Sequence, residues 1–185
     1  MAIIFSASGT ATAGGVQSTY ELAQQALLEG QLSDIRDNTI STQIAEAGAT
    51  AFGNVVVYNS GGSVANSAKT IAASGDTVLG VNVLTYVDEQ ATDSDGRPAV
   101  ASGMVMNVVN EGAVAVYVTG AVNPSSPVRV LHTASGTGKA GQFSHAFASG
   151  KTSRLSNARF LTSTTSSGVA ILELNGPSFT LSADS

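Results

Sequence analysis

The chain of 185 residues contains no cysteine and no tryptophan, and it has two histidines and four prolines. Without cysteine it forms no disulfide, no thiolate metal site and no cysteine nucleophile. No apolar run approaches the roughly 20 residues that a membrane-spanning helix needs. Thirteen acidic against eight basic residues leave a net charge of −5, which argues against nucleic acid as a partner. We therefore expect no membrane or nucleic-acid partner, and few groups are available for catalysis.

Small and β-branched residues make up most of what is present. The chain has 27 Ala, 24 Ser, 20 Gly, 20 Val and 18 Thr, which together supply 109 of 185 residues. Side chains of this kind suit packed sheets, tight turns and broad flat contacts. The hydrophobic fraction of 43% excludes disorder of the whole chain. The length is that of one ordinary domain.

Charge is divided unevenly along the chain. Residues 1–111 hold 11 acidic and 3 basic residues, a balance of −8, whereas residues 112–172 hold 5 basic residues and no acidic one. The simpler interpretation is that two faces of one domain differ in solvated charge. The alternative is head-to-tail complementarity between copies, or with a charged partner surface.

The N-terminal residues predict an arm followed by a helix. Residues 1–17 are expected to form an extended arm, and residues 18–185 a single β-rich domain. Because the first residues lack a basic region, they indicate a mature N-terminus rather than a signal peptide. A short helix is expected after the arm, because Ser18 and Glu21 have capping-box spacing and Gly30 stands where a C-cap would fall. Residues 34–48 are too polar and ambiguous to assign.

After Gly48 short β-type runs alternate with turn residues, without helical patterns between them. This favours an antiparallel β-sandwich or barrel, of which a jelly roll is one form. Gly80 interrupts one run and predicts a bulge or a close backbone approach. The turn-like residues 110–112 predict a hairpin whose second arm, apolar on both faces, is a central strand. The eight expected strands cover residues 55–58, 77–86, 104–109, 113–118, 127–132, 143–147, 158–162 and 168–174.

Three patterns that suggest chemistry are each outweighed by a structural interpretation. Residues 136–141 match a dinucleotide-binding glycine pattern, but the residues that follow do not open a helix, so a hairpin loop is favoured. Residues 88–96 form an acidic loop that lacks the full spacing of a calcium loop, and whether it binds a cation is left open. His132 and His145 have no nearby carboxylate in sequence to orient them for hydrolysis. We expect no enzyme, no cofactor and no metal site.

A series of short motifs carries a family resemblance across residues 30–174. In chain order the motifs are GQLSD at 30–34, FGNVVV at 52–57, GDTVLGV at 75–81, MVMNV at 104–108, GAVAVYV at 112–118, AV at 121–122, GQF at 141–143, ARF at 158–160 and GVAILEL at 168–174. In these motifs the chain resembles the structural cement, or head decoration, proteins of tailed bacteriophages.

The resemblance implies a small all-β protein on the outer surface of the virion capsid, made in the bacterial host cytoplasm. Its partners would be the major capsid protein, whose neighbouring subunits it would clamp, and further copies of itself as a homodimer or homotrimer. The apolar tip Ile3, Ile4 and Phe5 is then expected to contact the capsid or a neighbouring copy. The alternative for the tip is the first strand of the domain's own sheet. The alternative for the protein is an adhesin that binds a glycan or receptor, which the scarcity of aromatic residues disfavours.

Overall fold

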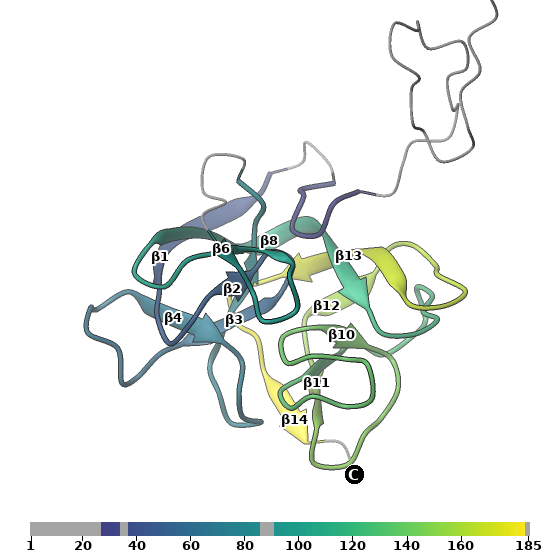
Figure 1. The fold of residues 1–185 in the computed structure, drawn as a ribbon. Helices are drawn as coiled ribbons and strands as arrows, with labels where there is room; N and C mark the ends of the chain where they lie inside the picture. The colour runs from purple at the N-terminus through teal and green to yellow at the C-terminus, as the bar shows by residue number, and fades with distance from the viewer. Residues whose placement is uncertain (1–26, 34–36, 86–90, 184–185) are drawn as a thin grey trace, which may run out of the picture.

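The computed structural model describes residues 27–33, 37–85 and 91–183, and all of its regular secondary structure in these ranges is β (Figure 1). The mainly β prediction is confirmed. The described ranges contain no helix that is long and apolar enough to cross a membrane. The strands are β1 (Thr39–Ala45), β2 (Thr50–Ala51), β3 (Val55–Tyr58), β4 (Ser67–Thr70), β5 (Val78–Asn82), β6 (Ala91–Thr92), β7 (Pro98–Val100), β8 (Val105–Val118), β9 (Arg129–Leu131), β10 (Phe143–Ser144), β11 (Thr152–Leu155), β12 (Ala158–Phe160), β13 (Gly168–Asn175) and β14 (Leu181–Ala183).

The predicted N-terminal helix is not supported. Most of it lies outside the described residues, and Leu27 and Leu28 are not helical. Gly30 instead lies in a turn with φ of 80°, in which the Gln31 amide donates to the Leu28 carbonyl at 3.0 Å. The chain then runs along β8, where Leu32 pairs with Val114. This pairing satisfies backbone groups of β8 that would otherwise form an open edge.

Five strands pair in a closed, barrel-like ring in the order β1, β4, β3, β5 and β8, with β8 pairing back to β1. A second set of strands extends from the far half of β8. There β13 pairs along residues 111–118, while β10 leads on to β9, β11 and β14. Strands β2, β7 and β6 form a separate small sheet. The sheet is not purely antiparallel as predicted, because β1 with β4 and β8 with β10 pair in parallel.

The expected hairpin around residues 110–112 is wrong, because β8 runs unbroken from Val105 to Val118. In the pairing with β1, Thr39 lies opposite Glu111 and Ile40 lies opposite Val109, so Asn110 is one extra residue in β8. Gly112 has φ of 130°, a conformation that only glycine adopts without strain. The turn-like residues therefore build a β-bulge instead of a chain reversal.

The bulge changes which face of β8 each side chain occupies. Before it, Met106 and Val108 are buried in the smaller core, together with Ala45, Val56 and Ala68 of the ring. After it, Val114 and Val116 are buried in the larger core against the second set of strands. Because side chains alternate with a period of two, one extra residue is enough to exchange the two faces. One strand thus contributes to both cores.

Gly80 confirms the predicted close backbone approach. Its pairing with β3 contains a register shift between Val56 and Val57, and its φ is 152°. A Cβ atom at residue 80 would lie 2.1 Å from the carbonyl oxygen of Val109, immediately before the bulge. The backbones of β5 and β8 therefore meet at a distance that only glycine permits.

Replacing Gly80 by alanine is expected to reduce the free energy of unfolding by about 3 kcal/mol, because the new methyl group overlaps a backbone oxygen that has no room to move. Gly103→Ala is the matched control: Gly103 also has positive φ, at 85°, but a Cβ there meets no atom within 4 Å. We expect this control to lose only about 1 kcal/mol. Chemical denaturation of both variants measures the difference, and equal losses would contradict the close-approach argument.

Candidate interaction surface

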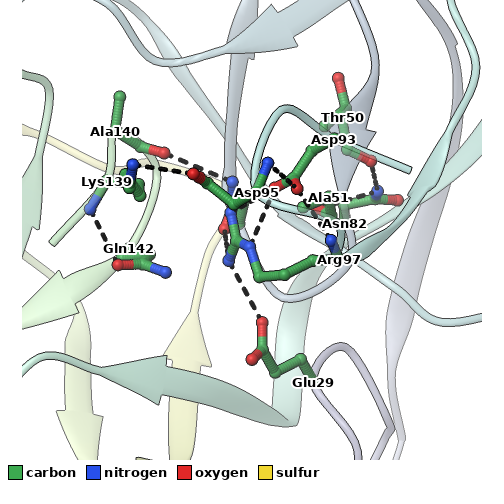
Figure 2. Close-up of polar contacts among 11 residues, drawn as sticks. Glu29, Thr50, Ala51, Asn82, Asp93, Asp95, Arg97, Lys139, Ala140 and Gln142 are labelled. Carbon is green, nitrogen blue, oxygen red and sulfur yellow. Dashed lines mark hydrogen bonds and ion pairs between the residues drawn. The ribbon is translucent and has the colours of Figure 1, made fainter. Parts of the chain in front are cut away.

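A largely buried arginine joins three distant parts of the chain. Arg97 precedes β7, and its Nη2 atom lies 2.8 Å from Oδ2 of Asp93, while its Nη1 atom lies 3.3 Å from Oε2 of Glu29. Nη1 also donates to the side-chain oxygen of Asn54 at 3.3 Å. Nearby, Lys139 forms an ion pair of 2.7 Å with Asp95 (Figure 2). The arginine thus ties the segment before β1, the turn 93–97 and the start of β3 together.

The pKa values of the two carboxyl groups bound to Arg97, those of Asp93 and Glu29, are shifted in opposite directions. Partial burial raises the pKa of Asp93, but backbone amides of Arg97 and Asp95 and the Arg97 charge outweigh it and hold the pKa below its usual value. Burial dominates at Glu29 and raises its pKa, although Arg97 opposes the shift. Both carboxylates therefore serve the internal ion pairs of the fold.

The acidic loop does not gather its carboxylates around a vacant centre. Asp93 accepts hydrogen bonds from the amides of Asp95 and Arg97 at 2.8 and 2.9 Å, which makes the turn itself. No cluster of three or more potential ligands occurs within the described ranges. Asp88 and Glu89, which belong to the same predicted loop, lie outside the described residues.

The glycine-rich residues 136–141 form a tight loop, as predicted, and contact the acidic turn. Ser135 and Gly138 exchange two backbone hydrogen bonds, of 3.0 and 2.9 Å, and no helix follows. At the end of the loop, a Cβ on Gly141 would lie 2.8 Å from the Asn54 side chain. The ion pair between Lys139 and Asp95 therefore satisfies part of the charge asymmetry within one molecule rather than between molecules.

Exposed apolar side chains lie on the outer face of β1 and β8, with the polar pair Thr42 and Asn107 between them. Ile44 of β1 lies opposite Val105 of β8, and Ile40 shares their face because it stands four residues before Ile44. Ile40 and Val105 are 44% and 46% exposed, and the neighbouring Met104 is 38% exposed. We call these four residues the β1–β8 strip.

Strand β1 places both polar and apolar side chains on each of its faces: Thr42 is exposed beside Ile40, and Ala45 is buried on the ring face. Ser41 and Gln43 point into the ring, where the Gln43 amide donates to the Ser41 hydroxyl at 3.3 Å and that hydroxyl donates to the Val108 carbonyl. Apolar side chains of β1 meanwhile face solvent. A sheet with one solvated face ordinarily places polar residues outside and apolar residues inside. Exposed Ile40 on the solvent face and Gln43 on the ring face depart from that pattern.

A second exposed apolar group lies in residues 145–151, the loop between β10 and β11. Phe147 is 51% exposed. Arg129 of β9 donates from its guanidinium to the His145 carbonyl, and Lys151 at the other end of the loop is exposed. Arg129 also lies opposite Arg154 in the pairing of β9 with β11. We call this region the Phe147 loop; it exposes an aromatic side chain in a loop adjoining the strands that carry these basic residues.

Sequence comparison now decides the family. The model of the structural cement proteins, described by E217 gp24 and Pam3 gp6, matches residues 16–175. The chain belongs to this family of phage structural cement proteins. Among curated proteins, no sequence matches it. The resemblance inferred from the motifs between residues 30 and 174 is confirmed, and the match extends it toward the N-terminus.

The fold of this cement protein recurs in a solved structure, "The capsid of Myoviridae Phage XM1". A chain of that structure is similar with a TM-score of 0.61 and 18% sequence identity, and the likeness covers 86% of this chain and 98% of that one. At this identity the likeness shows the common fold. It places the ring and the second set of strands within an architecture already observed in a capsid structure.

The site residues predicted from sequence are not those that the structure presents. Ile3, Ile4 and Phe5 lie outside the described residues, so their contact with the capsid or a neighbour stays a prediction. Sequence reasoning missed the β1–β8 strip and the Phe147 loop. Ile40 falls in the segment that was left unassigned, although its alternation with Ser41 and Gln43 would have indicated a strand. The sequence predicts a strand over residues 143–147, whereas β10 ends at Ser144 and Phe147 lies in the loop.

Arg97→Ala is expected to reduce the free energy of unfolding of the cement protein by about 3 kcal/mol, since it leaves two largely buried carboxylates without their cation. Arg159→Ala is the matched control: Arg159 also pairs with a carboxylate, that of Glu173, but its side chain is 63% exposed. Its loss is expected to stay within about 1 kcal/mol.

The pH dependence of this Arg97 effect has a defined sign. In the wild type, the part of the lowered Asp93 pKa that Arg97 causes stabilises the fold above the unfolded pKa and is lost on acidification. The difference between wild type and Arg97→Ala should therefore shrink as the pH falls from 7 to about 3. Urea denaturation at several pH values measures it, and a difference that is constant with pH would contradict the electrostatic explanation.

Proposed function

We propose that this protein binds the outer surface of the assembled phage head and cements neighbouring subunits of the major capsid protein. The observation that carries the proposal is the family match over residues 16–175. The fold shared with a chain of the phage XM1 capsid structure supports the same setting. The protein is then made in the bacterial host cytoplasm and becomes part of the virion.

The exposed groups suit a role that depends on many repeated contacts. The β1–β8 strip exposes aliphatic side chains, and the Phe147 loop adds an aromatic side chain of the kind that dominates contact energies. A modest contact on one copy is repeated at every position of a shell, so that the whole assembly is held by avidity. Such a protein stabilises a head without needing one very strong site.

The proposed role is structural rather than catalytic. Three of the more buried carboxylates are engaged in ion pairs, namely Glu29 and Asp93 with Arg97 and Glu173 with Arg159. The hydroxyl of Ser144, next to His145, accepts a hydrogen bond from the Ala146 amide at 3.0 Å. These groups maintain the fold, which supports a protein that acts through its surface.

The proposal is tested with heads from a phage that lacks this protein. Purified protein is added to the heads, and we expect it to co-sediment with them, to saturate at a fixed number of copies per head and to raise the temperature at which the heads release their DNA. Electron cryomicroscopy of the decorated heads then shows where the density is added. Heads that bind no protein, or binding to host cells in place of heads, would overturn the proposal in favour of an adhesin.

The apolar tip is tested by replacing Ile3, Ile4 and Phe5 together with serine, which keeps the length of the arm. If the tip docks on the capsid or on a neighbour, the isolated protein should keep its melting temperature while its attachment to heads falls about tenfold or more. Deleting residues 2–13 should give the same two results. A large loss of melting temperature without added heads would show instead that the tip belongs to the domain's own sheet.

A further inference from the structure

Two exposed apolar surfaces of this protein carry opposite charge at their margins. The β1–β8 strip is flanked by carboxylates at both ends of β1. Asp37 precedes the strand, and Glu111 accepts a hydrogen bond from the Thr39 hydroxyl at 3.1 Å. Glu46 follows the strand and accepts from the Ser63 amide at 2.8 Å. Within the strands of the ring, Lys69 of β4 is the one cation against these acidic groups.

Glu46 is held ionised by its surroundings. A hydrogen bond from the Ser67 hydroxyl lowers the pKa of Glu46, and the Ser63 amide lowers it further. The carboxylate therefore remains negative under mildly acidic conditions.

The Phe147 loop is the counterpart in chemistry. Its exposed aromatic side chain belongs to the loop that ends at exposed Lys151, and Arg154 of the following strand β11 is also exposed. These residues lie in the part of the chain, residues 112–172, that contains no acidic residue. An aromatic side chain with a basic margin matches an aliphatic strip with an acidic margin, both in apolar contact and in charge.

The two surfaces lie on opposite sides of the molecule. Figure 1 shows β1 and β4 at one side, and β10, β11 and β14 at the other. A contact between the two surfaces cannot form within one chain, but it can form between two chains that are arranged head to tail. Such a heterologous contact repeats from copy to copy and either closes a ring or continues as a row.

We propose that neighbouring copies of this protein contact each other head to tail, with the Phe147 loop of one copy seated on the β1–β8 strip of the next. The inference rests on the proposed function, in that the shell brings the copies together. It goes further in naming the partner that these two surfaces contact, which is a second copy of the chain rather than the capsid. The cement would then link its own copies across the capsid surface as well as binding the surface itself.

The absence of cysteine makes a cross-linking test free of background from the protein itself. Two variants, Val105→Cys and Phe147→Cys, are added to protein-free heads separately and as an equal mixture, and a bismaleimide reagent is then applied. We expect linked pairs of chains in the mixture and none with either variant alone, because residue 105 of one copy faces residue 147 of the next. A chain carrying both substitutions should give a ladder of linked copies.

Gly75→Cys is the control for random encounters between crowded copies, since a side chain there meets no neighbouring atom. Pairs formed by Val105→Cys alone would mean that two strips face each other and would overturn the proposal. So would variants that attach normally but give no linked pairs in the mixture. If the wild type does not attach to heads at all, the proposed function fails at that earlier step, which separates the two outcomes.

A second measurement uses serine variants, which contain no cysteine, as in the wild type. Phe147→Ser and Val105→Ser change exposed side chains, so both should keep the wild-type melting temperature. Each should lower the number of copies retained on heads at limiting protein concentration, by about tenfold or more. Retention equal to the wild type for both variants would show that these surfaces carry no contact and would overturn the proposal.

Discussion

Strand β8 is shared by the ring and the second set of strands because the β-bulge at residues 110–112 exchanges the faces on which its side chains lie. The extra residue Asn110 moves alternate side chains from the smaller core to the larger one, so one continuous strand supports the ring and the second set of strands. The surrounding chain is adapted to the bulge. Gly80 approaches the Val109 carbonyl, and the Gly176 amide donates to the Asn110 carbonyl at 2.9 Å. The relative position of the two halves follows from this short segment.

The contacts of Arg97 with Glu29, Asn54 and Asp93, here called the Arg97 cluster, depend on that relative position of the two halves and help to hold it. Its members come from residues 29, 54, 93 and 97, which lie together once β3 and β5 have paired and the small sheet has docked. Asn82 of β5 secures the small sheet, since its buried side-chain amide donates to the Thr50 and Ala51 carbonyls at 3.0 and 3.2 Å (Figure 2). Buried polar groups of this kind specify one arrangement, because any other would leave them without partners.

The ring does not simply bury apolar side chains and expose polar ones. The ring accepts Ser41 and Gln43 inside and leaves Ile40 and Val105 outside, which costs hydrophobic burial in the isolated protein. In the proposed contact between copies, burial of the strip would offset that cost. The internal ion pair between Lys139 and Asp95 neutralises some of the charge asymmetry, whereas Asp37 and Glu111 near the strip and Lys151 and Arg154 near the Phe147 loop are exposed. The charges that remain are placed where contacts between molecules can use them.

Local sequence was sufficient for the fold class and for several strands. Val55–Tyr58 and Gly168–Asn175 carry β-branched and aliphatic side chains that leave little alternative to a strand, and the ordered motifs were enough to indicate the family. Gly80 predicted a close approach between two backbone segments, because it interrupts a run of apolar residues. These features depend on neighbours in sequence, and they are therefore visible in it.

Tertiary structure alone decided the rest. Residues 110–112 suit a hairpin turn as well as a bulge, and only the pairing of both flanks with β1 and β13 selects the bulge. Strand β11 is too polar to be recognised, because its hydrogen-bonding partners, not its own side chains, hold it extended. The apolar strip and the Phe147 loop also arise from folding, since exposure is a property of what lies next to a residue in space. Sequence thus determined the kind of structure, whereas long-range pairing determined which side chains face outward.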